Sequence, residues 1–395
     1  MAPFHHSLFR ILWLTTVASQ VATWMQNAAA GWQMTLLTEA ALPVALLQTA
    51  TSLPFILVGI PSGALADVVE RRRVLVATHV WLAACAATLA ILSASGHVEP
   101  WVLLALTLSV GFGTAVNNPA ILAALVDAVP RSDLPDATTL ASAAINAARA
   151  AGPPLAGAVI ALAAPAAAYA VVALAFAAVA LTASRLTLPR ARPEPTLPAP
   201  SFRRLLRLRT FRVVLARTAL FIGGASALWS LLPLVAARHL ELGPEGFGLL
   251  VGLLGTGAVL GAVALTPLRE RLSTEAVAVA GTALFAAASA ALASTTGAVA
   301  GGALMLLLGL AWLATRSTLT IAAQLTVPNS ARGRAFAAQL LIWHTGQACG
   351  GIVWALVAQR FGLPAALLGS SLVLGAGMLV AGFSLRLPRE DATAA

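Results

Sequence analysis

Apolar segments that are long enough to cross a lipid bilayer recur along this chain. About twelve are present, at residues 11–36, 43–66, 74–95, 100–126, 137–163, 165–187, 211–236, 246–268, 276–296, 299–327, 335–358 and 363–386. A helix needs roughly 20 apolar residues to cross a hydrocarbon core of about 30 Å. Only 10% of the 395 residues are charged, against about 25% in soluble domains. The sequence therefore predicts an all-α membrane protein and excludes a water-soluble domain.

The two halves of the chain repeat each other weakly at an offset of 198 residues. The matching pairs are Gly59 with Gly257, Gly111 with Gly309, Pro130 with Pro328, Ser132 with Ser330, and Gly152 with Gly350. Residues 188–206 contain five prolines among arginines and are too polar to enter a bilayer. We therefore predict a six-helix bundle at 1–187, a cytoplasmic linker at 188–206 and a second six-helix bundle at 207–395. Two halves related by an axis along the membrane normal are one established plan for transporters.

The positive charge of the chain lies in alternate loops. The net charge is +10, and every one of the 24 basic residues is arginine. Arginines cluster at residues 71–73, 185–212 and 269–271, whereas the intervening loops carry few basic residues. This alternation follows the positive-inside rule, so we expect both termini and the linker to face the cytoplasm. Because the charge follows the membrane topology, it does not indicate a nucleic-acid partner.

The loop at residues 63–73 resembles the Gly-x-x-x-Asp-Arg-x-Gly-Arg-Arg motif of the major facilitator superfamily. Gly63, Asp67, Arg71 and Arg72 match it, but Val68 and Glu70 depart from it. Residues 24–32, 129–134 and 146–157 are similar to the enterobactin and macrolide exporters of that superfamily. The resemblance implies twelve helices in two pseudo-symmetric bundles and a monomeric protein of the bacterial inner membrane. It also implies export of drugs, siderophores or secondary metabolites by proton antiport and alternating access. A lysophospholipid flippase, an uptake symporter and a membrane sensor or assembly partner that does not transport remain alternatives.

The same resemblance implies a conformational latch on the cytoplasmic side. It would comprise Gly63, Asp67, Arg71, Arg72 and Asp127, with the two carboxylates and Arg71 holding the outward-open state. Arginine presents a planar fork that can bind two carboxylates, and a carboxylate near the membrane needs such a partner. The alternative is that these charges only anchor the loops in water.

Three arginines fall inside apolar spans, where a charged side chain needs a polar surrounding. Arg316 is the best candidate to contact an anionic or polar group of a substrate, and a contact between helices is the alternative. Arg149 lies one turn after Asn146, on the same face, where it can also satisfy a carbonyl freed by Pro153. Arg217 is two turns inside its span, so its side chain can extend to the cytoplasmic surface.

Polar and aromatic side chains at helical spacing predict a wet cavity for small amphipathic molecules. Amide contacts between helices are the alternative for each residue taken singly. With the arginines above, the predicted set comprises Gln20, Thr23, Trp24, Asn27, Asn117, Asn146, Arg149, Trp312, Arg316, Gln339, Trp343, His344 and Gln347.

Proton coupling has no obvious residue in this sequence. We find no Asp or Glu at the middle of any span, so His344, Asp67 and Asp127 are the candidates. His344 and His79 could titrate, although a single His inside a span is more often packed and hydrogen-bonded. No phosphate-binding loop, metal-ligand spacing or catalytic grouping is present, so we expect no enzyme activity, no cofactor and no metal.

Overall fold

A computed structural model describes the backbone of residues 2–188 and 202–384. Within those ranges, the side chains of residues 60–68, 131, 202, 266, 269, 270 and 381–384 lie outside the description. The long helices are α1 (Ser7–Leu37), α2 (Ala41–Val68), α3 (Arg71–Ala94), α4 (Pro100–Asp127), α5 (Leu134–Leu162), α6 (Pro165–Arg185), α8 (Arg209–Leu234), α9 (Pro244–Arg271), α10 (Thr274–Ser294), α11 (Ala298–Leu325), α12 (Arg332–Phe361) and α13 (Leu363–Ser384). Short helical turns complete the described chain: η1 (Ala2–His5), η2 (Arg131–Asp133), α7 (Phe202–Leu205), η3 (Val235–His239) and η4 (Asn329–Ala331).

The long helices coincide with the predicted spans, and each end lies within about four residues of its prediction. Ten spans in the described residues are long and apolar enough to cross a membrane. Helices α1 and α5 are not among these ten spans, because both carry many polar side chains. Polar side chains within the membrane need protein or water beside them. We therefore expect the polar sides of α1 and α5 to face away from the lipid.

The sequence repeat is also a repeat of structure. Helices α4 and α11 both have 28 residues, and their first residues are 198 positions apart. Each is followed by a three-residue 3-10 turn, η2 or η4, and the next helix begins directly after that turn. The offset therefore relates helix boundaries and not only single glycines and prolines.

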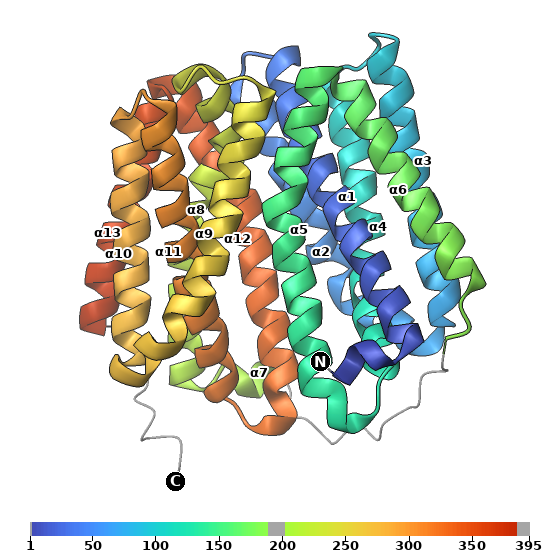
Figure 1. Ribbon diagram of the computed structural model, residues 1–395. Coiled ribbons are helices and arrows are strands. Elements are labelled where there is room, and N and C mark those ends of the chain that lie inside the picture. Colours follow the sequence, from blue (N-terminus) through green and yellow to red (C-terminus); the bar gives the residue numbers. More distant parts are fainter. Residues whose placement is uncertain (1, 189–201, 385–395) are drawn as a thin grey trace. The chain divides into compact units, whose positions relative to one another are not determined.

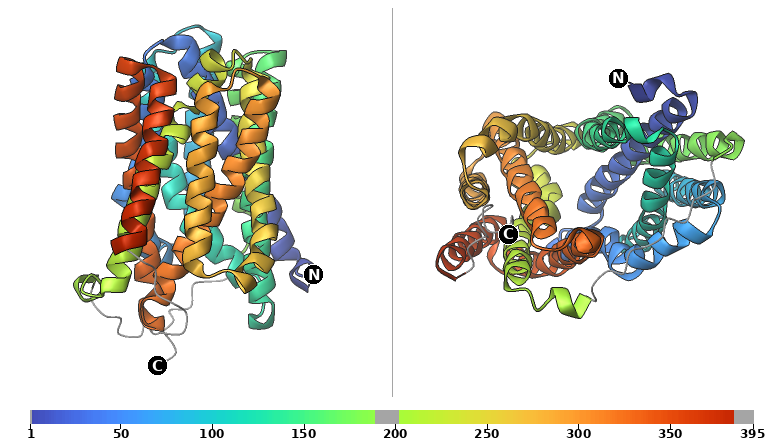
Figure 2. Two further views of the ribbon diagram at one scale, coloured as in Figure 1. Left: turned by 90° about the vertical axis from the view of Figure 1, so that its left-hand side faces the viewer. Right: turned by 90° about the horizontal axis from the view of Figure 1, so that it is seen from below.

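The described chain forms two compact units. Within the described residues, unit 1 comprises 2–39, 50–188 and 242–252, and unit 2 comprises 40–49, 202–241 and 253–384. In unit 1, α1 packs against α4, α5 and α6, and α3 packs against α4 and α6 (Figure 1). In unit 2, α8 packs against α11, α12 and α13, and α10 packs against α11 and α13 (Figure 2). The neighbours in one unit thus correspond to the neighbours in the other, helix by helix.

The repeated glycines lie where two helices approach closely. A Cβ on Gly152 of α5 would meet the Cβ of Trp24 on α1, and one on Gly350 of α12 would meet the Ser226 hydroxyl on α8. In the same way, Gly111 lies at the close approach of α4 to α2, and Gly309 lies at the close approach of α11 to α9. Small residues at helix contacts are typical of membrane proteins, where close backbone approach replaces the hydrophobic drive.

The predicted boundary between the bundles lies mostly outside the described residues. Positions 189–201 of the predicted linker are outside them, and the short helix α7 begins at the first residue after that gap. The division at 188–206 therefore stays a prediction.

Candidate functional site

An aromatic cluster lies inside unit 2. Trp312 of α11 is its centre, with ring centroids 5.1 Å from Trp229 and 5.3 Å from Trp343. Phe221 of α8 lies 5.7 Å from Trp312 and 5.9 Å from Trp343. Phe285 of α10 packs edge-on against Phe221 at 5.5 Å. Four helices thus bring five aromatic rings into one cluster, with tilted and edge-to-face contacts that favour aromatic association.

Arg316 borders this cluster. Its guanidinium carbon lies 5.4 Å from the centroid of the Trp343 ring, which is a cation–π contact. The side chain is half-buried, and no carboxylate or carbonyl in the described part of the chain pairs with it. The alternative of an ion pair or carbonyl contact between helices therefore has no partner there. A guanidinium that rests on one indole face keeps its N–H edges available for an acidic group.

Several polar atoms around the cluster are buried without a hydrogen-bond partner among the described residues. They are the indole N–H groups of Trp229 and Trp343, the Gln339 carbonyl oxygen, and the hydroxyls of Thr315 and Thr318. The Gln339 amide nitrogen lies 3.4 Å from the Thr218 hydroxyl, which accepts its hydrogen bond. Buried polar groups in folded proteins are nearly always paired. These donors and acceptors are therefore suited to bind water or a ligand.

Two further predicted cavity residues lie on α12, close in sequence to Trp343. His344 and Gln347 are both half-buried. The Gln347 amide has no hydrogen-bond partner within the described residues. The proposed proton-carrying role of His344 stays a prediction.

The predicted residues of unit 1 fall into two kinds. Arg149 of α5 lies over the Trp24 ring of α1 at 5.1 Å. Gln20 and Asn27 are half-buried, and their amides have no hydrogen-bond partner among the described residues. The contact of Arg149 with Trp24 resembles that of Arg316 with Trp343, since each places a cation on an indole ring.

The other three predicted residues of unit 1 bond to neighbouring helix atoms. Asn117 is 3% exposed and accepts a hydrogen bond from the Thr78 hydroxyl at 3.1 Å. Asn146 donates to the Ser142 carbonyl at 3.0 Å, and Thr23 donates to the Ser19 carbonyl at 2.9 Å. For Asn117 this is the amide contact between helices that the sequence analysis gave as the alternative to a cavity position.

His79 has the packed environment that its alternative reading described. It is 1% exposed, and its ring nitrogens lie 2.9 Å from the Ser19 hydroxyl and 2.8 Å from the Leu75 carbonyl.

The predicted latch is described only in part. Arg71, at the first residue of α3, forms an ion pair with Asp127, at the last residue of α4. Arg72 donates to the Ser184 carbonyl at the end of α6. Gly63 and Asp67 lie in the segment 60–68, whose side-chain environment is outside the description. Their part in the latch stays a prediction.

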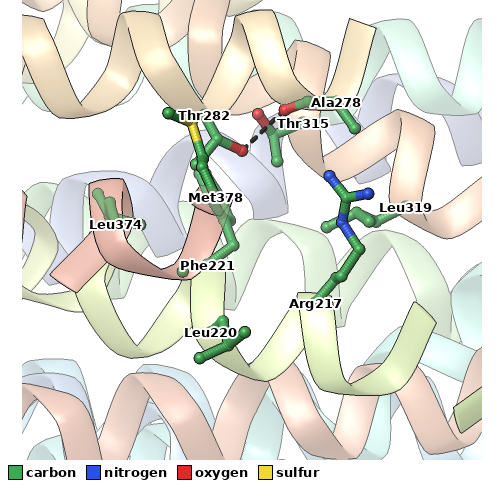
Figure 3. A pocket seen from close by; sticks show the side chains of 10 residues that line it. Arg217, Leu220, Phe221, Ala278, Thr282, Thr315, Leu319, Leu374 and Met378 are labelled. Carbon is green, nitrogen blue, oxygen red and sulfur yellow. Dashed lines mark hydrogen bonds between the residues drawn. The ribbon is translucent and has the colours of Figure 1, made fainter. Parts of the chain in front are cut away.

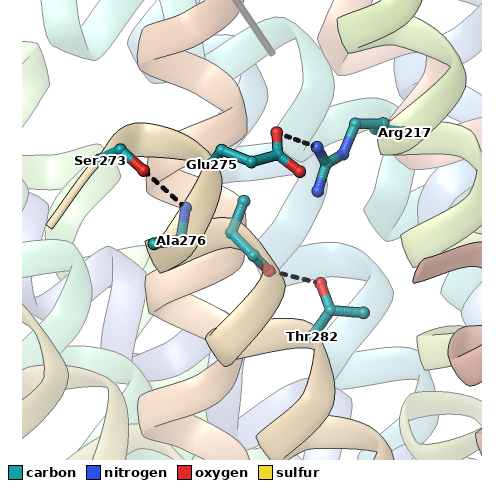
Figure 4. Close-up of polar contacts among 6 residues, drawn as sticks. Arg217, Ser273, Glu275, Ala276 and Thr282 are labelled. Atoms are coloured by element: carbon teal, nitrogen blue, oxygen red, sulfur yellow. Dashed lines mark hydrogen bonds and ion pairs between the residues drawn. The ribbon is translucent and has the colours of Figure 1, made fainter. Parts of the chain in front are cut away.

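Arg217 contradicts the expectation that its side chain extends to the membrane surface. It is 6% exposed, and its Nη1 lies 2.5 Å from Oε2 of Glu275 on α10 (Figure 4). Glu275 lies one residue outside the predicted span at 276–296, so the sequence did not predict this pair. The structure begins α10 at Thr274, with the Ser273 side chain accepting a hydrogen bond from Ala276 N at 3.2 Å. The Ser-Thr-Glu sequence before the apolar run was the signal of a helix start that includes Glu275.

The described residues contain no group of three or more His, Cys, Asp or Glu side chains that could hold a metal ion. What the site offers is π-faces, one half-buried cation and unsatisfied hydrogen-bonding groups. Such a set can bind an amphipathic molecule, but it does not form a nucleophile–base grouping.

Comparison with known proteins identifies the family. A family model described as transmembrane secretion effector matches residues 1–395. No curated protein matches the chain in sequence. A bacterial homolog of the human lysosomal transporter Spinster, in an inward-facing and occupied conformation, has a TM-score of 0.80 at 14% identity, over 95% of this chain and 96% of that one. The nucleoside transporter NupG has a TM-score of 0.75 at 13% identity, over 98% of this chain and 100% of that one.

A third similar structure is a POT family transporter, with a TM-score of 0.75 at 11% identity, over 98% of this chain and 96% of that one. At such identities these structures show the fold alone, and they confirm the all-α major facilitator fold that the sequence predicted. The family and these neighbours are transporters and not enzymes. Because the family model spans the full length of this multi-pass membrane protein, the chain belongs to the transmembrane secretion effector family.

Proposed function

We propose that this protein is a secondary active transporter that exports small amphipathic compounds by alternating access, in exchange for protons. The observation that carries the proposal is the cluster of Trp312, Trp343 and Phe221 with Arg316 at its border. An aromatic cluster binds flat apolar rings of many shapes, and a single cation orients a polar or acidic end. The substrates would be drugs, siderophores or secondary metabolites that combine a ring system with a polar group.

The unsatisfied groups support ligand binding rather than a purely structural cluster. A structural aromatic core loses stability when its indole N–H groups have no acceptor, because each buried donor forfeits its bonds to water. A substrate or water that accepts from Trp229 and Trp343 would restore those bonds. The unsatisfied indole N–H groups therefore support a ligand-binding role for the cluster.

We place the protein in a bacterial inner membrane, with both termini cytoplasmic and the monomer as the working unit. The support is the alternation of arginine along the loops. The substrate is then taken from the cytoplasm or the inner leaflet and released outside. The partners are the substrate, protons and the lipid bilayer, with no nucleic acid.

The binding test uses three ligands of one shape: 2-naphthalenesulfonate, 2-naphthalenesulfonamide and a trimethylammonium analogue of the same ring. We expect calorimetry on the purified full chain to give the tightest binding for the sulfonate. Arg316→Gln should weaken sulfonate binding at least tenfold and change binding of the neutral sulfonamide little, since only the anion uses the guanidinium. Trp343→Leu should weaken all three ligands, because all three use the ring surface.

Equal losses for the anion and the cation in Arg316→Gln would contradict the role of Arg316. The substitution Arg360→Gln is a matched control, because Arg360 is an exposed residue at the end of α12. The direction of transport is tested in a bacterial host that lacks its own exporters. An exporter lowers cellular accumulation of the compounds it carries, whereas increased accumulation would identify an uptake symporter.

A further inference from the structure

The ion pair between Arg217 and Glu275 is unusual for its position. Both residues lie within membrane-spanning helices, and the Glu275 side chain is 27% exposed. Taking two charges out of water is unfavourable, and replacing a buried pair by apolar residues often leaves stability unchanged or improves it. Ionisable residues inside membrane spans commonly mark ion or proton pathways. Stability alone is therefore a weak reason for this pair.

Beside the pair is a small cavity within unit 2, with a mostly apolar lining and three polar residues. Arg217, Thr282 and Thr315 line it together with apolar side chains of α8, α11 and α13 (Figure 3). Its volume of about 20 Å³ accommodates about one water molecule. The Thr315 hydroxyl is 1% exposed and has no hydrogen-bond partner among the described residues. A water in this cavity would bond to Thr315 and lie beside the Arg217 guanidinium.

The cavity and the aromatic cluster share their walls. Phe221 lines the cavity and also contacts Trp312 and Trp343. Thr315 lines the cavity and directly precedes Arg316 on α11. Phe221 and Arg217 lie one turn apart on the same face of α8, so the ion pair and the aromatic cluster adjoin each other on that helix.

We infer that Glu275 is the proton-binding residue of transport and that Arg217 is its counter-ion. This inference rests on the proposed function, because it assigns the coupling ion to a residue of the proposed exporter. A proton from water adds to the Glu275 carboxylate, so an O–H bond forms and the ion pair with Arg217 breaks. Arg217 stays charged and turns toward the cavity water. Helices α8 and α10 then lose their charged contact and keep the packing of Phe221 on Phe285. Phe221 shifts within the cluster, and the substrate is released.

Arg217 is the charged group that faces Glu275 among the described side chains of the helices packed against α10. Helix α11 carries Arg316 as its one charged residue, which does not line the cavity, and the sequence of α13 contains no charged residue. Arg212 and Arg271 are exposed. The side chains of Arg269 and Glu270 lie outside the described residues. Protonation of Glu275 at this site therefore removes the charge that faces Arg217.

The experiment measures how the binding of 2-naphthalenesulfonate depends on pH, since this ligand stays anionic throughout. If one proton leaves when one ligand binds, the apparent Kd rises up to about tenfold for each pH unit of acidification. We expect that slope in the wild-type protein and none in Glu275→Gln. Glu99→Gln is the control, because Glu99 is exposed and makes no side-chain cap bond at the start of α4; it should keep the wild-type slope.

A slope that persists in Glu275→Gln overturns the inference and leaves coupled export intact. A wild-type slope of opposite sign that vanishes in Glu275→Gln keeps Glu275 as the proton site but overturns exchange with the substrate. If the wild-type protein shows no pH slope at all, both the assignment of Glu275 and the exchange of substrate for protons are overturned.

The single variant leaves Arg217 without its carboxylate, so it could fail to fold. The double variant Arg217→Gln, Glu275→Gln removes both charges, so neither is left buried without its partner. We expect it to be purified as a monodisperse protein that binds the sulfonate with no pH slope. An infrared titration of the protonated carboxyl band should then lack one group relative to the wild type. An unchanged band would overturn the assignment without reference to any substrate.

Discussion

The three arginines inside the spans have three different environments. Arg217 has a carboxylate at 2.5 Å, Arg149 lies on the Trp24 ring, and Arg316 lies on the Trp343 ring. An ion pair neutralises the charge, whereas a cation–π contact leaves the guanidinium edge able to bind an anion. The neighbours therefore divide one residue type into a counter-ion, Arg217, a candidate ligand contact, Arg316, and a residue packed on an indole ring, Arg149.

The pair between Arg71 and Asp127 yields a prediction at the same scale. A cation at a helix N-terminus and an anion at a helix C-terminus both oppose the helix dipole. Each of these residues has that unfavourable position, and their ion pair offsets both penalties. We expect Asp127→Asn to reduce transport in proteoliposomes severalfold while insertion into the membrane stays normal. The free energy of unfolding should fall by only about 1 kcal/mol, since Asp127 is partly exposed.

The control for that prediction is Glu70→Gln. Glu70 pairs with Arg73 at 3.0 Å, but the two side chains are 49% and 80% exposed. Exposed pairs contribute little, so neither transport nor stability should change measurably. If Asp127→Asn transports at the wild-type rate, the pair anchors the loop and takes no part in the transport cycle.

At the scale of elements, the repeated glycines control how closely helices pack. A Cβ on Gly309 would meet the Leu254 carbonyl oxygen and the Ala258 backbone nitrogen, so α11 and α9 would have to separate. Overpacking of this kind is typically destabilising by about 1–3 kcal/mol. We expect Gly309→Ala to lower the melting temperature of the purified protein in detergent. Gly375→Ala is the control, because a Cβ there has no neighbour within 4 Å among the described atoms. Equal melting temperatures for the two variants would contradict this account of the repeat.

The helices could be predicted from sequence because each span carries its own signal. The apolar length of a span depends on consecutive residues, and the glycine repeat can be read from a fixed offset along the chain; both agree with the structure. The partners of the polar residues could not be predicted in the same way. Glu275 lies 58 residues from Arg217 in sequence, and Trp343 lies 27 residues from Arg316, so only the packing of helices brings each pair together. The same holds for Asn117, whose partner Thr78 lies on another helix.

At the scale of the whole molecule, the arginine pattern predicts an orientation in the membrane. Described arginines 203, 204, 207, 209 and 212 are exposed, at α7 and the first residues of α8. The hairpin between α3 and α4 carries instead His97 and Glu99. Arginine retains cytoplasmic loops during insertion, so these two regions should lie on opposite sides of the bilayer.

Labelling with a membrane-impermeant maleimide tests that orientation. The native thiols are first removed with Cys85→Ala and Cys349→Ala. Ser95→Cys and Thr210→Cys then place single thiols at exposed positions and leave every arginine in place. We expect Ser95→Cys to react in intact spheroplasts and Thr210→Cys to react only in inverted vesicles. The reverse pattern would put the arginine-rich region outside. The exposed arginines would then not retain these loops in the cytoplasm. Exchange with protons would in that orientation carry a substrate bound at the aromatic cluster into the cell.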